Sequence, residues 1–514
     1  MKKAVPYTVL FSLFVFGLAL GSPGEAWSAP KGKLVMAFGV DPSTLDPPMF
    51  AEIQATNVVT NIYECLVNRV FKEGKIQHEP MLATSWELIN DTTWIFRLKK
   101  GVKFHNGEDF NAEAVKYTFE RILNPAQKAR RRYLISSVER VDIVDPYTVR
   151  IITKVPQPAF IVNLGFGIWI VPPKYFKEKG DAYVATHPVG TGPYKFVRWV
   201  KDEEIVLEAN ETYYGGAPAI KTVVFKPIPD DSTRVAALLG GDVDIAKNVP
   251  INLIPMVNKS DRAKVMVTPA GLTISVKFET MKAGSPLQDK RIRQAINYGV
   301  DKEAIIKHIM EGHGTPVGTP LSPSHIGYAP DIKPYSYNPE KAKALLKEAG
   351  YERGLTLTLH APSGRYMKDK EFAEAIAYQL AEVGINLKVQ TYEWGSYTKI
   401  LYSPDPVDHM LILGWGSTFD PDGILSPNLQ CGESLSRYCN KQLDSLLTQA
   451  RGTMDPKKRM DLYHRALQMI HEEAPFLFLW QGVDTYGVSN RVQHWSPTPD
   501  ESFTAVMQRV SLKD

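Results

Sequence analysis

The stretch LTLTLHAPSGRYMKDKEFAEAIAYQLAEVGINLKV, residues Leu355–Val389, joins two strand patterns through a helix pattern. At its start leucine alternates with threonine, which predicts a strand with one apolar face. An apolar stripe at helical spacing then runs from Phe372 to Val383 and stops at Gly384, after which a second alternating strand begins at Ile385. Two strands joined by such a crossover pair in parallel, so this stretch predicts an α/β fold.

A further strand pattern ends in a polar loop at His409–Leu425, HMLILGWGSTFDPDGIL. The apolar run Met410–Leu413 has the length of a buried strand and stops where glycine, tryptophan and small polar residues begin. Ligands of open α/β sheets bind beyond the carboxyl ends of the strands, so this loop suits a small polar molecule. The alternative is a surface turn whose tryptophan fills a gap in the core. The candidate ligand-binding residues here are Gly414, Trp415, Gly416, Ser417, Thr418 and Asp420.

The rest of the chain divides into two parts of different character. Before Gly271 strand patterns dominate, at residues 33–38, 93–104, 138–153, 204–209 and 220–226. After Gly271 helix and strand patterns alternate, and the tail from Val488 to Val510 looks like a return to the first part. We therefore expect one strand-rich lobe and one α/β lobe, with the C-terminus rejoining the first.

The composition is that of an ordinary soluble globular protein. The 514 residues suffice for more than one domain, and 44% of them are hydrophobic and 23% charged. The formal net charge is +4, and no run of basic residues is longer than Arg130–Arg132. This charge pattern lacks the footprint of a nucleic-acid-binding surface, so we expect no nucleic-acid partner.

The N-terminus has the pattern of a secretory signal peptide, to which we assign residues 1–29. Two lysines precede the apolar segment Val9–Leu20, and small residues suitable for cleavage follow it. The apolar segment is shorter than the roughly 20 residues that a membrane-spanning helix needs. The first cysteine is Cys65, so none lies near the cleavage region to carry a lipid. We therefore expect a soluble mature protein in the periplasm.

Cys431 and Cys439 are the candidates for a disulfide bond. They lie close together in a chain that the signal peptide directs out of the cytoplasm, where disulfides persist. Such a bond would close the loop that follows the strand at 409–414. Cys65 is flanked by apolar residues, which favours a buried small hydrophobe over a reactive thiol.

Motifs for catalysis are missing from the sequence. It has no G-x-S-x-G elbow, no phosphate-binding P-loop, no H-E-x-x-H and no C-x-x-C pair. His464 and His471 lie at helical spacing beside two glutamates, but a solvated helix face explains them better than a metal site does. Asp420 and Asp422 could form an acid–base pair, yet nothing nearby would separate their pKa values. We therefore expect neither an enzyme nor a bound metal or other cofactor.

A longer block indicates the family. The stretch Leu82–Arg121, LATSWELINDTTWIFRLKKGVKFHNGEDFNAEAVKYTFER, closely resembles the conserved block of the family 5 extracellular solute-binding proteins, the peptide- and nickel-type receptors of ABC importers. The resemblance extends over residues 33–511, with further matches at Asp41–Pro47, Pro188–Phe196, Arg291–Tyr298, Asn338–Leu346 and Tyr438–Asp444.

The resemblance implies a two-lobe periplasmic-binding-protein clamp of the large type. Lobe I would comprise residues 30–270 and 481–514, with an extra subdomain at about 60–185, and lobe II residues 271–480. Receptors of this family capture a solute between the lobes, close over it, and deliver it to a membrane permease. The expected partners are therefore a small-molecule or peptide ligand and the permease subunits of an ABC transporter, and we expect the receptor itself to be a monomer.

The ligand-binding loop departs from that of the peptide receptors. In those receptors an aspartate three residues after the loop tryptophan holds the α-amino group of the peptide, and Thr418 occupies that position here. Asp420 or Asp422 could replace it after a shift of the loop. The leading hypothesis remains a receptor for di- or oligopeptide-like solutes. The alternatives are a non-peptide ligand, such as an opine, an oligosaccharide or a nickel chelate, and a secreted hydrolase.

Arg365 is the candidate cation of the cleft. It lies in the stretch Pro362–Tyr366, which resembles a loop found in one branch of the family. A guanidinium can clasp a carboxylate with two parallel hydrogen bonds. The alternative is an exposed arginine paired with Asp369 or Glu371. Further candidate contacts, each of which could instead be a core or turn residue, are Thr44, Tyr63, Tyr133, Trp169, Tyr366 and Trp394.

Overall fold

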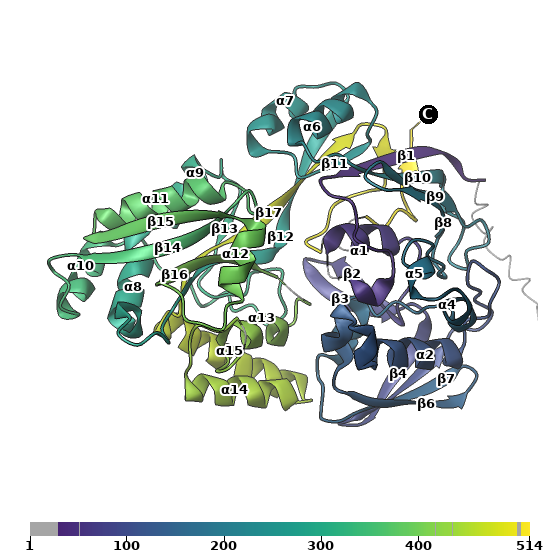
Figure 1. The fold of residues 1–514 in the computed structure, drawn as a ribbon, viewed down its shortest axis with the longest axis horizontal. Coiled ribbons are helices and arrows are strands. Elements are labelled where there is room, and N and C mark those ends of the chain that lie inside the picture. Colours follow the sequence, from purple (N-terminus) through teal and green to yellow (C-terminus); the bar gives the residue numbers. More distant parts are fainter. Residues whose placement is uncertain (1–28, 51, 417, 434, 501–504, 514) are drawn as a thin grey trace, which may run out of the picture.

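Two long strands, β12 (Ala263–Phe278) and β17 (Phe476–Ser489), connect the two lobes of the molecule. The computed structural model describes residues 29–50, 52–416, 418–433, 435–500 and 505–513, so the predicted signal peptide, apart from residue 29, lies outside the described residues. The pairing of β12 with β17 is antiparallel and carries one sheet from lobe I, on the right of Figure 1, to lobe II on the left. This arrangement is the two-lobe α/β clamp that the sequence predicts.

The shared sheet is eleven-stranded, with the order β15-β14-β16-β12-β17-β11-β1-β10-β9-β8 and β13 (Thr315–Pro316) paired to β17. In lobe II, β14 (Leu355–Ser363) and β15 (Ile385–Glu393) are parallel and are joined by α11 (Asp369–Ala381), which confirms the predicted crossover. β16 (Met410–Trp415) pairs in parallel with the other side of β14.

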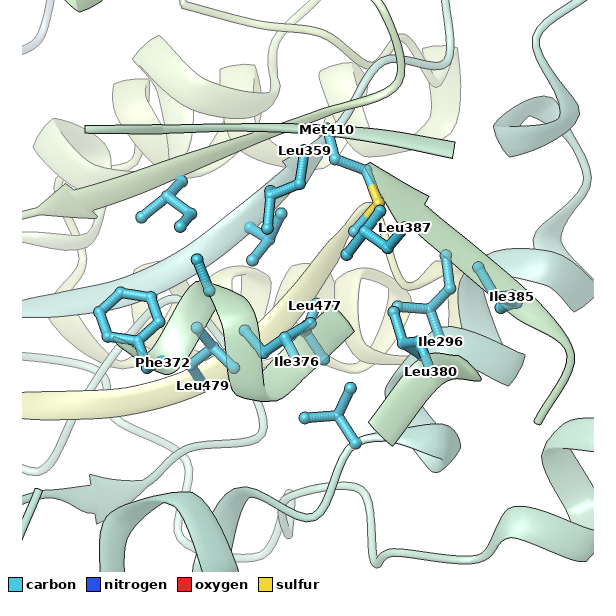
Figure 2. Packing of buried hydrophobic residues seen from close by; sticks show 14 of the residues in the cluster. Ile296, Leu359, Phe372, Ile376, Leu380, Ile385, Leu387, Met410, Leu477 and Leu479 are labelled. Atoms are coloured by element: carbon cyan, nitrogen blue, oxygen red, sulfur yellow. The ribbon is translucent and has the colours of Figure 1, made fainter. Parts of the chain in front are cut away.

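The core of lobe II lies between α11 and these strands. Phe372, Ile376 and Leu380 point from the helix toward Leu359 and Leu477 on the sheet, and all five side chains are fully buried (Figure 2). The other helices around this core are α8 (Lys290–Gly299), α9 (Lys302–His308) and α10 (Pro339–Glu348). A second cluster, below the loop after β16, unites α13 (Pro421–Leu429), α14 (Lys441–Gly452) and α15 (Pro456–Glu473).

Lobe I holds the other end of the sheet. Its strands are β1 (Lys31–Phe38), β8 (Tyr194–Val200), β9 (Glu204–Ala209), β10 (Ile220–Pro227) and β11 (Ile245–Lys247). Its helices are α1 (Ile53–Val59), α4 (Pro173–Lys179), α5 (Asp181–Val184), α6 (Asp231–Gly240) and α7 (Ile254–Asn258). Ala505, Met507 and Val510, near the C-terminus, pack in one cluster with Leu34 and Phe38 of β1. The short strands β18 (Val492–Gln493) and β19 (Ser511–Leu512) pair beside it.

A separate cluster of buried residues between Leu66 and Ile170 forms the core of an extra subdomain in lobe I. Its antiparallel sheet has the order β4-β5-β7-β6, with β4 (Ala83–Asn90), β5 (Thr93–Leu98), β6 (Val138–Asp145) and β7 (Thr148–Thr153). The hairpin of β2 (Val67–Lys72) with β3 (Lys75–Pro80) and helices α2 (Ala112–Leu123) and α3 (Phe160–Gly165) complete it. Asn111 caps α2 as predicted, because its side chain accepts hydrogen bonds from the first-turn amides.

The two lobes meet at a bulge in β12. The register against β17 shifts between Pro269 and Thr273, and Gly271 lies inside this bulge. A Cβ on Gly271 would come within 2.6 Å of the Phe419 ring and 2.7 Å of the Pro499 carbonyl oxygen. Only glycine therefore fits where the loop of lobe II and the C-terminal segment of lobe I approach the same point. Among the described residues, no helix has both the length and the apolar character needed to cross a bilayer.

Candidate ligand-binding site

Three parallel strands of lobe II end at one edge of the sheet. β14 ends at Ser363, which is paired with Glu393 at the end of β15, and β16 ends at Trp415 on the other side of β14. Arg365 follows the first strand and Trp394 follows the second. The structure thus brings together Arg365, Trp394 and Trp415, which lie far apart in the sequence, at the carboxyl edge where α/β sheets bind their ligands.

The Arg365 side chain is exposed and lies over two aromatic rings. Its guanidinium carbon is 5.2 Å from the ring centre of Tyr366 and 5.1 Å from that of Trp394. Within the described part of the chain no carboxylate forms an ion pair with it: Glu371 pairs with Lys368, and Asp369 accepts the backbone amide of Arg365 instead. The alternative of an arginine paired with these acids is therefore wrong for the described residues. The guanidinium has five N–H donors available for a ligand.

Tyr366 joins the Arg365 loop to the end of β16. Its hydroxyl donates to the carbonyl of Gly414 at 3.4 Å, and a Cβ on Gly414 would lie 2.6 Å from the tyrosine ring. The pKa of Tyr366 is raised because burial outweighs the opposite effect of the nearby Arg365. The ring meets Trp394 edge-on at 6.3 Å, and Trp394 stacks on the buried Tyr397 at 5.9 Å. These contacts make a continuous aromatic wall beside the guanidinium.

Trp415 is partly buried and is held in one orientation. Its indole N–H donates to the carbonyl of Gly423 at 3.1 Å. Its ring packs against two buried clusters, one with Leu413 and Leu435 and one with Ile424. Gly416, which follows, is exposed, and a Cβ there would lie 2.1 Å from the Gly271 carbonyl oxygen. The tryptophan therefore both fills space and shapes a loop that lies against the junction of the lobes.

The two acidic residues of this loop have partners within the protein. Thr418 is buried, and Ser417 lies outside the described residues. Asp420 is 1% exposed and receives two hydrogen bonds from the Arg459 guanidinium, at 2.8 and 2.7 Å. Asp422 accepts from the Ser426 hydroxyl and from Arg451. The structure thus gives both candidate amine-binding carboxylates another role, and the ligand contact of Asp420 stays a prediction.

The candidates of lobe I are divided between core and surface. Tyr63 and Trp169 are buried in its main core, where the Tyr63 hydroxyl accepts the Val189 amide at 3.2 Å. The hydroxyl of Thr44 donates to the carbonyl of the distant Ala185 at 3.3 Å and accepts the Asp46 amide at 3.2 Å, so it stabilises a turn inside the lobe. Tyr133 is 58% exposed. Of these four candidates it is therefore the most accessible to a ligand.

The structure also reveals contacts across the junction that the sequence did not indicate. Phe419 is 2% exposed with a φ of 66°, a left-handed conformation uncommon for a bulky residue. Its ring centre lies 5.3 Å from that of His325 in lobe II and 5.5 Å from the guanidinium carbon of Arg69 in lobe I. Arg69 in turn forms a buried ion pair with Asp500. Burial lowers the pKa of Arg69 and Asp500 raises it. No sequence signal marks these residues, because their contacts join distant segments.

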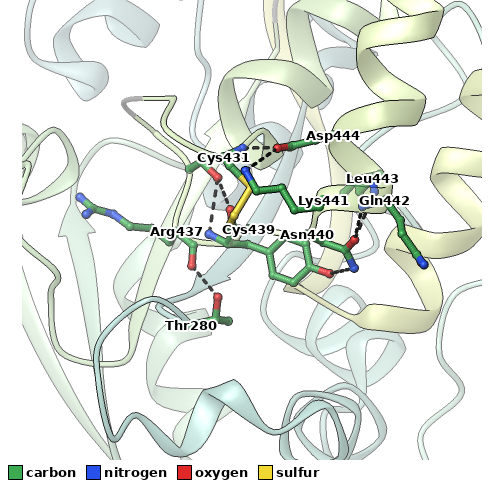
Figure 3. The surroundings of a disulfide bond; sticks show 11 residues. Thr280, Cys431, Arg437, Cys439, Asn440, Lys441, Gln442, Leu443 and Asp444 are labelled. Atoms are coloured by element: carbon green, nitrogen blue, oxygen red, sulfur yellow. Dashed lines mark hydrogen bonds and ion pairs between the residues drawn. A yellow bond between two sulfur atoms is a disulfide. The ribbon is translucent and has the colours of Figure 1, made fainter.

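The disulfide predicted between Cys431 and Cys439 is present (Figure 3). Inside the closed loop, the buried Arg437 donates to the carbonyls of Leu401 at 3.1 Å and Ser403 at 2.8 Å. These carbonyls lie at the C-terminal end of α12 (Trp394–Leu401), the helix that begins with the wall residue Trp394. The loop that the disulfide closes thus contacts the C-terminal end of the helix that begins at the candidate Trp394. The third cysteine, Cys65, is buried as predicted, which raises the pKa of its thiol to about 12.

Comparison with known proteins identifies the family of the chain. The family model described as bacterial extracellular solute-binding proteins, family 5 Middle, matches residues 77–436. The chain belongs to this family. It is 33% identical to heme-binding protein A of Haemophilus influenzae over 92% of each chain. It is 32% identical to the dipeptide-binding protein of Escherichia coli over 90% of this chain and 92% of the other.

A solved structure shows the same fold. The periplasmic binding protein DppA of Helicobacter pylori, in complex with the peptide STSA, matches 94% of this chain and 98% of its own with a TM-score of 0.79 and 29% identity. Family 5 consists of binding proteins rather than enzymes, and its members are periplasmic or extracellular. The chain is a solute-binding receptor of an ABC importer, which works with membrane permease subunits.

Proposed function

We propose that this receptor takes up small peptide-like solutes and that Arg365 binds their carboxylate. The observation that carries the proposal is the exposed Arg365 guanidinium, which lies at the carboxyl edge of three parallel strands without an acidic partner among the described residues. An arginine in this setting can form two parallel hydrogen bonds with a carboxylate. Tyr366, Trp394 and Trp415 would line the neighbouring apolar part of the ligand.

The site offers no obvious partner for the α-amino group of a peptide among the described residues. Thr418 stands where the peptide receptors have their aspartate, and Asp420 already accepts two hydrogen bonds from Arg459. We therefore propose that recognition depends mainly on the acid end of the ligand, and that Asp420 supports the loop from inside lobe II. Such a receptor would accept acidic solutes with a blocked or absent α-amino group. The name of the Haemophilus relative, a heme-binding protein, is a reason to test non-peptide ligands as well.

Closure of the lobes would convert binding into a transport signal. We propose a division into lobe I (residues 30–270 and 481–514, with the subdomain at about 60–185) and lobe II (271–480), which agrees with the bulge between Pro269 and Thr273 in β12. A ligand that contacts both lobes stabilises their closed arrangement through these additional contacts. No bond of the ligand needs to change, so the proposed function requires no catalysis. We also propose export through the signal peptide at 1–29 to the periplasm, without a lipid anchor.

Calorimetric titration tests the proposal. The probes are the dipeptide Ala-Phe, its C-terminal amide, an opine, a short oligosaccharide and a nickel chelate. We expect the free-acid dipeptide to bind, its amide to bind at least about tenfold more weakly, and Arg365→Ala to remove this difference, since a charge-assisted pair is lost in both cases. At 100 times its dissociation constant, a true ligand should add about 2.7 kcal/mol to the free energy of unfolding.

Arg353→Ala is the matched control. Arg353 is also exposed, but it precedes β14 at the opposite end of the strand. Its removal should leave binding of every probe unchanged. If only a non-peptide probe binds, the peptide assignment is wrong. If Arg365→Ala binds the free-acid dipeptide as tightly as the unchanged receptor does, Arg365 is not the carboxylate site.

A further inference from the structure

The loop that carries Arg365 is folded around one buried carboxylate. Asp369 is 3% exposed, and its oxygens accept the backbone amides of Gly364 at 3.1 Å, Arg365 at 2.8 Å and Tyr366 at 3.0 Å. Three successive backbone donors thus converge on a single side chain. Bonds from amides to an ionised carboxylate are about twice as strong as those between neutral groups. Asp369 therefore fixes the path of the backbone through Arg365.

The backbone on both sides of these amides is in an uncommon conformation. Gly364 has a φ of 75°, and Lys368 has a φ of 56°, so the loop turns through left-handed positions before and after Arg365. A left-handed conformation is unfavourable for a residue with a side chain such as lysine. The converging hydrogen bonds of Asp369 offset this cost. Without them, other paths of the loop would compete with the one observed.

Asp369 differs from an ordinary residue of a first helical turn. It is the first residue of α11, yet its side chain reaches backward to the preceding loop, and it also accepts the next amide, that of Lys370, at 3.0 Å. The next acid in this turn, Glu371, is exposed and pairs with Lys368. Within the described part of the chain, Asp369 has amide partners and no basic side chain as a partner. Asp369 thus serves to fix the conformation of the loop.

The loop is also attached at its far side. The Tyr366 ring lies against Gly414, and its hydroxyl donates to the Gly414 carbonyl. Because Asp369 binds the amide of Arg365 and that of Tyr366, one carboxylate sets both the guanidinium and the aromatic ring over which it lies. A displacement of this backbone would move both groups together.

We infer that Asp369 is a positioning residue, which orients the Arg365 guanidinium for the ligand's carboxylate and so determines selectivity for acidic ligands. The inference rests on the proposed function, because it assumes that Arg365 binds the ligand. Asp369 itself does not touch the ligand. Its carboxylate acts through the loop, by holding the guanidinium in its binding orientation before the ligand arrives, which reduces the cost of ordering it.

The test is a double-mutant cycle between Asp369→Asn and Arg365→Ala, with the free-acid dipeptide Ala-Phe and its C-terminal amide as probes. We expect Asp369→Asn to weaken binding of the free acid about tenfold and to leave the amide nearly unchanged, because the loss of charge weakens the bonds that hold the loop. In the Arg365→Ala background, Asp369→Asn should have no further effect. Glu371→Gln, in the same helical turn, is the matched control and should bind both probes normally.

Amide hydrogen exchange provides a readout that does not depend on the ligand. In the full chain, Asp369→Asn should increase exchange at Gly364, Arg365 and Tyr366 while the amides of β14 stay protected. Unchanged exchange at these three amides would overturn the inference even if no probe bound.

The double-mutant cycle distinguishes the proposed role of Arg365 from the inferred role of Asp369. If Arg365→Ala leaves affinity for the free acid unchanged, the proposed function fails and the inference fails with it. If Arg365→Ala weakens binding but Asp369→Asn does not, the inference alone is wrong. If Asp369→Asn weakens both probes equally, or still weakens binding in the Arg365→Ala background, Asp369 has only a general structural role.

Discussion

Two arginines of lobe II carry the same charge in opposite surroundings. Arg365 lies on the strand-end surface, the carboxyl edge of β14, β15 and β16, and Arg459 lies in the core below it. Arg459 is 6% exposed and donates to both oxygens of the buried Asp420. Arg365 is exposed, lies over two aromatic rings and has no acidic partner among the described residues. The difference distinguishes a cation that stabilises the fold of this lobe from one that can recognise a ligand. An internal pair holds the loop, whereas a guanidinium without an internal acid is free to bind a ligand.

The largest effect is expected from breaking the internal pair. Arg459→Ala would leave the Asp420 carboxylate, 1% exposed, without its cation, and should lower the free energy of unfolding by about 3–5 kcal/mol. Urea denaturation of the unliganded receptor measures this loss. Lys457→Ala, at an exposed position of the same helix, should change stability by less than about 0.5 kcal/mol. A loss below about 1 kcal/mol for Arg459→Ala would show that the pair is dispensable and would weaken the contrast with Arg365.

The junction beside this loop should respond to acid. His325 is 5% exposed, and its Nδ1 accepts the Ser322 amide at 3.0 Å. Burial lowers its pKa from 6.5 to about 4. Between these pH values the unfolded chain binds a proton that the folded chain does not, so stability is lost as the pH falls from 6.5 toward 4. The expected contribution is on the order of 2–3 kcal/mol.

Comparison of urea denaturation at pH 7 and pH 4.5 for the unchanged receptor and for His325→Gln checks this contribution. Glutamine can accept the Ser322 amide and does not titrate, so the variant should lose less stability on acidification. His78 and His105, whose pKa values burial also lowers to about 4, should supply part of the acid sensitivity that remains. An identical pH dependence in both proteins would exclude His325 as a source.

Sequence patterns reveal the strand-end surface better than the core beneath it. The parallel unit at 355–389 and the polar loop after residue 413 follow from periodicity, because side-chain spacing reports local structure directly. The pairing of Asp420 with Arg459 joins residues far apart in the chain, and no local pattern encodes it. The alternative interpretation of Arg365 pairs it with Asp369 or Glu371. The structure instead directs the Asp369 carboxylate to three backbone amides, and backbone donors carry no sequence signature.

The smallest effect on stability is expected from Arg365 itself. Its contact with the two rings is exposed, and such cation–π contacts contribute about 0.5–1 kcal/mol. Arg365→Ala should therefore lower the free energy of unfolding of the unliganded receptor by no more than about 1 kcal/mol. Arg365→Lys should retain this stability but bind an acidic ligand more weakly than arginine does, because an ammonium cannot form the two parallel bonds of a guanidinium. Denaturation with and without the free-acid dipeptide measures both quantities in one series. A large loss of stability without ligand would place Arg365 with Arg459 as a structural cation, and the distinction between surface and core on which its proposed role depends would disappear.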